Sequence, residues 1–273
     1  MDKKILIFIL TYNHENTVIS VLDRIPKEIW DKATEILVAD DESKDNTKEL
    51  VLDYKKKNNL SNLTVIKHEE NKGYGGNQKF CYNYGIEKGY DIAVMVHGDG
   101  QYAPEEIPNL LEPLEHNLAD FVFGSRMTGH PIKGGMPIYK FFGNKVLTTI
   151  ENLFLRTNLS EFHSGFRLYS LDALKQIPFN KLSDDYYFDS EIILQLVLAK
   201  KRIAEKTIPT HYGNEICYVN SVPYGLSILK MLGEFTLHKN RIKRYNKFDI
   251  KNFNNLPKKP HEKIHYGYFP SEY

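Results

Sequence analysis

The part of this sequence best suited to chemistry is an acidic residue between two glycines, directly after an apolar run. Residues 93–96, AVMV, have the pattern of a buried strand, and Asp99 follows within the segment HGDGQ. In open α/β sheets, ligands bind in the crevice outside the carboxyl ends of the strands. The Asp99 carboxylate is a hard ligand for Mg²⁺ or Mn²⁺, and Gly98 and Gly100 let a diphosphate approach the backbone. A strand followed by aspartate also occurs in ordinary turns, so both interpretations stay open at this point.

The first half of the chain alternates between apolar runs and amphipathic segments. The apolar runs predict strands at residues 5–10, 35–39, 63–68, 93–96 and 121–123. Helices are predicted from 16–17, from 45–47, over about 77–88 and from 104, after a flexible glycine corner at 73–76. Strands and helices that alternate at this spacing indicate right-handed βαβ units and a mainly parallel sheet. The polar turns after the strands would then gather at one edge of that sheet.

The second half has less decisive patterns. Residues 140–155 carry aromatic and aliphatic side chains at helical spacing. Core packing is the default interpretation, and contact with a lipid is the alternative. The loop at 129–136 has the glycine content of a lid. An amphipathic helix is predicted at about 222–237, and the basic segment 238–247 after it suits an anionic membrane surface or a solvated helix end.

Composition excludes several classes of protein. The chain has 273 residues and a formal charge of +1, so a nucleic acid partner is not expected. Two cysteines, Cys81 and Cys217, are too few for a disulfide framework and indicate buried thiols in a reducing compartment. No apolar stretch predicts a membrane span or a secretion signal, so a cytoplasmic location is expected. The absence of GxGxxG after the first strand and of GxxxxGK[ST] argues against dinucleotide oxidoreductases and P-loop NTPases.

Further polar residues follow the other strands. Asp40 and Asp41 come after the strand at 35–39, as a carboxylate that recognises a nucleobase or ribose would. Their alternative role is helix capping, which is the better interpretation for Asp45. The glycines at 73–76 would cradle a phosphate or form a tight loop. Arg126 follows the strand at 121–123, where it would clamp a phosphate through two hydrogen bonds or lie on the surface.

Two more acids, Asp189 and Glu191, stand at the start of an apolar helix. Either would serve as a general base on an acceptor hydroxyl or bind hydroxyls of a sugar. The alternative is that they stabilise the positive end of the helix dipole. A phosphate acceptor is already ionised near neutral pH, so it needs a base far less than a sugar hydroxyl does.

Six segments in this order, TYNHENTV, VADDESKDNT, NKGYGGNQ, HGDGQYAPEE, FGSRMTG and HSGFRLYS, resemble the family 2 inverting glycosyltransferases of the GT-A fold. The most similar branch is the polyprenyl-phosphate (dolichyl-phosphate) mannosyl- and glucosyltransferases, and the resemblance covers roughly residues 4–229. It implies an α/β fold with a Rossmann-like, mainly parallel central sheet and flanking helices. The nucleotide and acceptor halves would be fused in one domain, residues 1–237, followed by a basic and then Tyr- and Pro-containing extension, residues 238–273.

The resemblance also implies roles for individual residues. The residues that would bind the nucleotide are Thr11, Tyr12, Asn13, Asp40, Asp41, Lys72 and Gly73. Those that would contact the donor and its phosphates are His97, Gly98 and Arg126, and those beside the acceptor are Ser164 and Arg167. The ligands of a Mg²⁺ or Mn²⁺ ion would be Asp99 and Gln101, with His97 as a further candidate where the family usually has the first acid of Asp-x-Asp. The catalytic residues would be Asp99, Arg126, Asp189 and Glu191.

These observations predict a metal-assisted inverting glycosyltransferase, a hexosyltransferase of cell-envelope glycan biosynthesis. It would move a sugar from a UDP- or GDP-linked donor to a polyprenyl phosphate, as a peripheral protein on the cytoplasmic face of the membrane. One alternative is a glycosyltransferase with a soluble acceptor, which builds a surface glycan or polysaccharide. Another is a non-catalytic protein that binds nucleotide sugars, with His97 marking a degenerate metal site.

Overall fold

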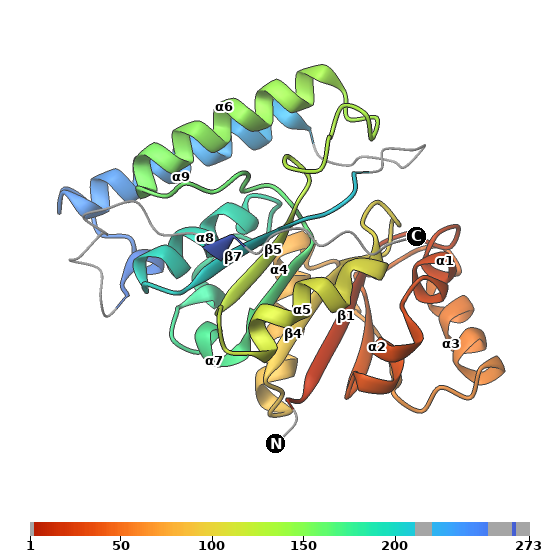
Figure 1. The fold of residues 1–273 in the computed structure, drawn as a ribbon. Helices are drawn as coiled ribbons and strands as arrows, with labels where there is room; N and C mark the ends of the chain where they lie inside the picture. The colour runs from red at the N-terminus through yellow and green to blue at the C-terminus, as the bar shows by residue number, and fades with distance from the viewer. Residues whose placement is uncertain (1–2, 211–219, 251–263, 266–273) are drawn as a thin grey trace.

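One mixed sheet of eight strands organises the computed structural model, which describes residues 3–210, 220–250 and 264–265 (Figure 1). The strand order is β3-β2-β1-β4-β6-β5-β7-β8. Four parallel neighbours form the first half: β3 (Leu63–Lys67), β2 (Glu35–Asp40), β1 (Ile5–Thr11) and β4 (Ile92–His97). The central strand β1 is buried along its whole length, because helices cover both faces of the sheet. The mainly parallel sheet expected from the sequence is confirmed.

The antiparallel strand β6 (Arg167–Ser170) joins the two halves of the sheet. It pairs with β4 on one side and with β5 (Phe121–Ser125) on the other. Beyond it, β7 (Ile203–Thr207) runs parallel to β5, and β8 (Ile264–His265) pairs with β7. The sequence did not predict β6, since its residues belong to the segment interpreted only as an acceptor motif.

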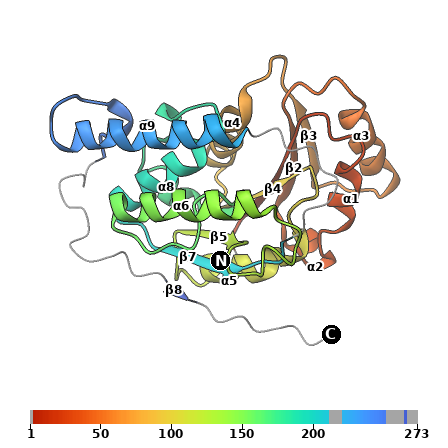
Figure 2. The ribbon, with the colours of Figure 1, turned by 90° about the horizontal axis from the view of Figure 1, so that it is seen from above.

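Helices cover the sheet on two sides (Figures 1 and 2). Apolar side chains of α1 (Val18–Asp23), α2 (Lys27–Lys32), α3 (Thr47–Lys57) and α5 (Ile107–Glu115) join one core cluster. The other cluster takes side chains of α4 (Gly73–Glu87), α7 (Leu171–Leu174), α8 (Phe188–Leu198), α6 (Ile138–Leu155) and α9 (Ser221–Lys239). Short 3₁₀ turns occupy Pro104–Glu106, Phe179–Lys181 and Asn246–Phe248. Within the described ranges, no helix is long and apolar enough to cross a bilayer.

Helices α6 and α9 contact each other and form an outer layer, at the top of Figure 1. Only Thr148, Glu151 and Leu155 of α6 are buried, so core packing explains only one stripe of this helix. The opposite stripe exposes large apolar side chains, among them Ile138, Phe142, Val146 and Leu153. The default interpretation of residues 140–155 as a core helix is therefore wrong for most of the apolar residues.

The glycines at 73–76 are not a corner before a helix, because they form the first turn of α4. The Gly75 amide donates to the carbonyl of Asp184 at 2.7 Å, and a Cβ on Gly75 would lie 2.5 Å from the carbonyl oxygen of Ser183. Glycine is needed here because the backbone of 183–184 packs directly on the helix. Helix α2, which begins after Pro26, was also not predicted.

Other expectations have mixed outcomes. The N-cap residue of α3 is Asn46 rather than the expected Asp45, although Asp45 does accept a hydrogen bond from the Thr47 amide in the first turn. Cys81 is buried as expected, and Cys217 lies outside the described residues. The lid at 129–136 stays a prediction; within it, Gly129 packs against the carbonyl of Ile208. The domain boundary at 237–238 also stays a prediction. Helix α9 continues past it to Lys239, and Phe248, which follows it, is buried in the core.

Candidate active site

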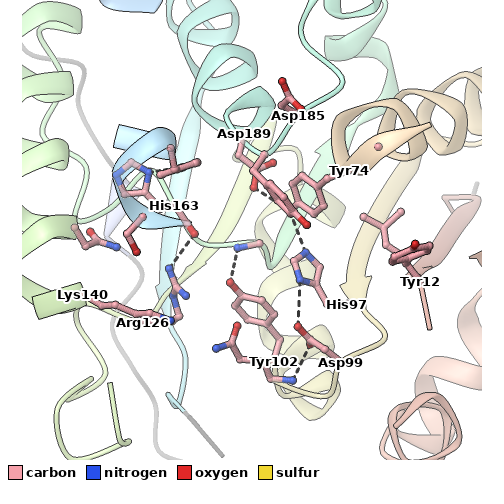
Figure 3. A pocket seen from close by; sticks show the side chains of 18 of the residues that line it. Tyr12, Tyr74, His97, Asp99, Tyr102, Arg126, Lys140, His163, Asp185 and Asp189 are labelled. Carbon is pink, nitrogen blue, oxygen red and sulfur yellow. Dashed lines mark hydrogen bonds and ion pairs between the residues drawn. The ribbon is translucent and has the colours of Figure 1, made fainter. Parts of the chain in front are cut away.

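A cavity of about 820 Å³ opens where strands β1 and β4 end (Figure 3). Thr11 and Tyr12 reach it from the end of β1, and His97 reaches it from the end of β4. Its other side is lined by Tyr139 and Lys140 of α6 and by residues of α9. The turns that follow the strands thus meet in one place, as the sequence pattern predicted for a ligand site.

Of the two neighbouring acids expected to bind a nucleotide, only Asp41 lines the cavity. Asp41 lines the cavity, and its Oδ1 accepts a hydrogen bond from the Lys72 amide at 2.7 Å. Burial raises the pKa of the Asp41 carboxyl against the lowering effect of these amide hydrogen bonds. Asp40 is fully buried and accepts from the Ser43 amide, and no described residue donates to its Oδ2. Asp40 therefore holds the turn after β2, and Asp41 faces the ligand space.

Of three other residues expected to contact a nucleotide, one lines the cavity and two do not. Gly73 lines the cavity at the start of α4, in the left-handed conformation with φ of 75°. Lys72 is exposed and lies outside the cavity lining. Asn13 also lies outside the lining, because its side chain accepts a hydrogen bond from the Lys44 amide.

Asp99 and His97 form the centre of the site. Oδ1 of Asp99 accepts a hydrogen bond from the Gln101 amide at 2.9 Å, and Oδ2 lies 4.0 Å from Nδ1 of His97 (Figure 3). Burial lowers the pKa of His97, an effect that the charge of Asp99 opposes. Gly98 must be glycine, because a Cβ would lie 2.6 Å from the Thr11 side chain. Gln101 lines the cavity beside them.

The described residues include no group of three or more His, Cys, Asp or Glu side chains that would hold a metal ion by themselves. Mg²⁺ is usually bound through one or two carboxylates together with substrate phosphates, rather than in an all-protein cage. Asp99 fits that arrangement, since it lies at the cavity wall with one oxygen directed toward His97. The residues therefore suit a divalent cation that arrives with a diphosphate.

A chain of hydrogen bonds connects His97 to Asp189. The hydroxyl of Tyr74 donates to Oδ2 of Asp189 at 2.9 Å and lies 3.1 Å from Nε2 of His97. Gln78 donates to the other oxygen of Asp189 at 3.0 Å. Tyr74 was not predicted as a site residue, although it stands between two glycines of the NKGYGGNQ segment.

Tyr102 and Gly165 complete the wall around His97. The ring of Tyr102 meets the His97 ring edge-on at 5.1 Å, and its hydroxyl accepts a hydrogen bond from the Gly165 amide. A Cβ on Gly165 would lie 2.4 Å from Cε1 of His97. Neither residue was predicted to have a role, and the only sequence signal for them is their place in the segments HGDGQY and HSGFR.

Arg126 lines the other side of the cavity, across from Asp99 in Figure 3. Its guanidinium pairs with Glu161 at 2.8 Å and donates to the carbonyl of His163 at 2.9 Å. Burial would raise the pKa of Glu161, but the charge and hydrogen bonds of Arg126 lower it overall. This buried pair fixes Arg126 at the cavity wall.

The acceptor residues inferred from the resemblance do not face the cavity. Arg167 is 1% exposed and donates to the backbone carbonyls of Phe162, Ser164 and Asp189. Ser164 is fully buried, and neither residue belongs to the cavity lining. Arg167 thus holds three backbone segments together.

The two candidate bases are also separated. Asp189 lines the cavity, whereas Glu191 is fully buried outside the lining. Glu191 pairs with Lys247 at 2.7 Å and accepts from the Ser183 amide at 2.7 Å. The structure brings together Asp99, Arg126 and Asp189 around one cavity and places Glu191 elsewhere.

A buried polar cluster lies behind the α6–α9 side of the cavity. Oε2 of Glu151 lies 3.2 Å from Nε2 of His163, whose Nδ1 lies 2.8 Å from the hydroxyl of Tyr224. Burial raises the pKa of Glu151 to about 8 and lowers the pKa of His163 to about 3. Both groups are therefore uncharged in the folded protein near neutral pH.

A mainly parallel sheet presents a carboxylate and an arginine to one cavity at its carboxyl edge, the place where open α/β sheets bind their ligands. Residues 6–178 match the sequence model of the family described as "Glycosyl transferase family 2", and the chain belongs to this family. The predicted family, fold class and glycosyltransferase activity are thereby confirmed.

Several relatives of this chain are named for the transfer of a sugar to a lipid phosphate. The chain is 33% identical over 247 residues to a UDP-N-acetylglucosamine--dolichyl-phosphate N-acetylglucosaminyltransferase of Methanococcus voltae, covering 84% of this chain and 97% of that protein. It is 29% identical to an undecaprenyl-phosphate mannosyltransferase of Micrococcus luteus, covering 75% and 82%. Among solved structures, the glucosyl-3-phosphoglycerate synthase of Mycobacterium tuberculosis has the same fold.

The structure of that synthase with Mn²⁺, UDP and phosphoglyceric acid matches with a TM-score of 0.60 at 18% identity, covering 86% of this chain and 75% of that chain. A second structure of the synthase contains Mg²⁺ and UDP and matches with a TM-score of 0.62 at 18% identity, covering 84% and 78%. That synthase has thus been crystallised with UDP and either divalent cation.

Proposed function

We propose that this protein transfers a sugar from a nucleoside diphosphate sugar to a polyprenyl phosphate, with inversion at the anomeric carbon. The observation that carries the proposal is that Asp99 and Arg126 face the same cavity from opposite sides. The names of the Methanococcus and Micrococcus relatives support a polyprenyl phosphate acceptor. The Methanococcus relative and the UDP complexes make UDP the first donor nucleotide to test, with GDP as the alternative.

Asp99, with Gln101 beside it, would hold Mg²⁺ or Mn²⁺. When bound, such an ion neutralises negative charge that develops on the leaving diphosphate. Arg126 supplies a second positive charge, already oriented by Glu161, so little reorganisation is needed during the reaction. The acceptor oxygen forms its bond to the anomeric carbon from the side opposite to the diphosphate, as the bond to the diphosphate breaks.

The surroundings of the two candidate bases favour a phosphate acceptor. Both oxygens of Asp189 accept hydrogen bonds, from Tyr74 and Gln78. Glu191 is bound by Lys247 away from the cavity. An ionised acceptor phosphate needs little help from a base, whereas a sugar hydroxyl does. With both oxygens of Asp189 engaged and Glu191 outside the cavity, neither of these two candidate bases is placed to take a proton, which suits a phosphate acceptor better than a hydroxyl of a soluble glycan.

The first test is isothermal calorimetry with UDP, GDP, CDP and dTDP, each with and without Mn²⁺. We expect one diphosphate to bind tightly only with the cation, and the matching radiolabelled nucleotide sugar to label polyprenyl phosphate. Asp189→Asn should weaken this transfer without abolishing it, while transfer to a hydroxyl acceptor would be abolished. If none of the four diphosphates binds with or without Mn²⁺, the enzyme proposal fails and the non-catalytic alternative becomes the leading one.

The exposed apolar stripe of the α6–α9 layer suggests how the enzyme meets a lipid acceptor, as a peripheral protein on the inner face of the membrane. The side chains that form the stripe, here called the α6–α9 surface, are Ile138, Phe142, Val146, Leu153, Val222, Leu226 and Leu229. Tyr139 and Lys140 lie next to the stripe and line the cavity. A polyprenyl phosphate could therefore place its phosphate in the cavity while its chain stays in the lipid.

Flotation with anionic vesicles tests this contact. The double variant Phe142→Ser, Leu226→Ser should lose most vesicle binding, whereas Leu118→Ser, an exposed leucine after α5, should bind like the wild type. UDP binding should be unchanged in both variants. Equal flotation of the double variant and the wild type would refute the membrane contact and leave the transferase proposal intact.

A further inference from the structure

We propose that His97 gives the divalent cation a nitrogen ligand through Nδ1, and that this ligand makes the site select Mn²⁺ over Mg²⁺. The inference rests on the proposed function, since the cation would arrive together with a nucleoside diphosphate. It concerns the position at which this chain departs from the Asp-x-Asp pattern of its family.

The hydrogen bonds of Tyr74 fix which nitrogen of His97 carries the proton. A tyrosine hydroxyl has one hydrogen, and Tyr74 donates it to the Asp189 carboxylate at 2.9 Å. At 3.1 Å from Nε2 of His97, the Tyr74 oxygen therefore acts as an acceptor. Nε2 carries the hydrogen, and Nδ1 keeps its lone pair. Asp189 accepts hydrogen bonds on both oxygens, since its Oδ1 accepts from Gln78, and Tyr74 is therefore the donor in the Tyr74–Asp189 bond.

The packing around the imidazole holds the ring in this orientation. Tyr74 and Tyr102 meet the ring edge-on, with centroids 5.5 and 5.1 Å away. The backbone of Gly165 lies so close that a Cβ there would be 2.5 Å from Nε2. A rotated ring would lose the hydrogen bond to Tyr74 without gaining room. Histidines that bind metal ions usually donate the N–H of their other ring nitrogen to an oxygen, which orients the ring. The hydrogen bond from Nε2 of His97 to Tyr74 is of this type.

Nδ1 faces the side of Asp99. It lies 4.0 Å from Oδ2 of Asp99, which is too far for a hydrogen bond and close enough for both atoms to reach one cation. Oδ1 of Asp99 is engaged by the Gln101 amide, so Oδ2 is the oxygen directed toward the gap. Figure 3 shows the two interactions of His97 on opposite edges of the ring, one toward Tyr74 and the other toward Asp99.

This donor set has a consequence for metal choice. Mg²⁺ prefers oxygen ligands in a near-ideal octahedron and gives up its water reluctantly. Imidazole is a ligand for first-row transition ions rather than for Mg²⁺. Mn²⁺ is the weakest binder of that series and still favours oxygen ligands, so one imidazole beside Asp99 and the diphosphate oxygens shifts the balance from Mg²⁺ toward Mn²⁺. Two aspartates would suit either ion, whereas His97 with Asp99 favours Mn²⁺. In this interpretation the histidine tunes the metal site and is not a sign of a degenerate one.

Pulsed EPR of Mn²⁺ bound with UDP tests the nitrogen ligand directly. The wild type should show a nitrogen coupling on Mn²⁺ that changes when the protein carries ¹⁵N-histidine and is lost in His97→Asp. His14→Gln is the matched control, because His14 also lines the cavity beside Gly98, and it should keep the coupling. In calorimetry of the wild type, UDP should bind more weakly with Mg²⁺ than with Mn²⁺. In His97→Asp, UDP should bind about equally well with either ion.

Tyr74→Phe tests the positioning step. Removing the hydroxyl should lower Mn²⁺ affinity about 10–100-fold in the presence of UDP, while UDP binding without metal stays unchanged. Bound Mn²⁺ with UDP but without nitrogen coupling would overturn the inference and leave the proposed function standing. If no diphosphate binds in any metal condition, the proposed function fails and this inference fails with it.

Discussion

Replacing Glu151 by glutamine should change how the stability of the protein depends on pH. Glu151 is fully buried on α6, and burial raises its pKa to about 8, against a usual value of 4.5. His163, which faces it at 3.2 Å, has its pKa lowered by burial to about 3 from 6.5. Tyr224 and Ser190 adjoin the pair, and the Arg167 guanidinium acts on both groups. Glu151 is therefore neutral in the folded protein between pH 4.5 and about 8, where it is charged in the unfolded chain. His163 is neutral in the folded protein between about pH 3 and 6.5, where it is charged in the unfolded chain.

The two groups act with opposite signs. Above pH 4.5, Glu151 is ionised in the unfolded chain and protonated in the folded one, so its contribution to stability is lost as pH rises toward 8. Below pH 6.5, His163 is protonated only in the unfolded chain, so stability is lost as pH falls toward 3. Between pH 4.5 and 6.5 the two slopes offset each other. Between pH 6.5 and 8 Glu151 acts alone, at about 1.4 kcal/mol per pH unit.

The wild type should therefore lose about 2 kcal/mol of unfolding free energy from this group between pH 6.5 and 8. Glu151→Gln keeps the size of the side chain and removes the ionisation, so it should not show this loss. Urea unfolding of both proteins at several pH values in this window gives the difference directly, because all other titrating groups cancel. Glu87→Gln, on the exposed side of α4, is the matched control and should follow the wild type. Parallel curves for the wild type and Glu151→Gln would refute the assignment of a neutral Glu151.

Three further substitutions test the site itself. Asp99→Asn should remove the effect of Mn²⁺ on UDP affinity in calorimetry, and a persisting metal effect would place the cation elsewhere. Gly165→Ala puts a Cβ 2.4 Å from Cε1 of His97, so kcat/KM for sugar transfer should fall about 100-fold; a rate near the wild type would show that this contact does not matter. Glu161→Ala leaves the buried Arg126 without its partner and should destabilise the protein by about 3–5 kcal/mol in urea unfolding, and a loss below about 1 kcal/mol would contradict that pairing.

The strands and the place of the central carboxylate followed from the sequence. Buried parallel strands need continuous apolar runs, and β1, β2 and β4 lie within a residue or so of the runs that predicted them. Asp99 follows such a run, so its position at the carboxyl edge of the sheet was determined once the strand was identified. The short strand β6 and the helix α2 were not predicted, because the residues of β6 were interpreted only as an acceptor motif and Pro26, which precedes α2, as the end of the preceding helix.

The partners of each polar side chain were decided only by the tertiary structure. Asp189 and Glu191 are two residues apart, so the helix directs them to different sides, one toward Tyr74 in the cavity and the other toward Lys247. The family resemblance placed Arg167 beside the acceptor, yet it donates to three backbone carbonyls and pairs with the Asp189 carboxylate at 3.6 Å. A local pattern sets the backbone state of a segment. Which distant group a charged side chain meets depends on how the elements pack, since a buried charge is stable only beside a partner that packing provides.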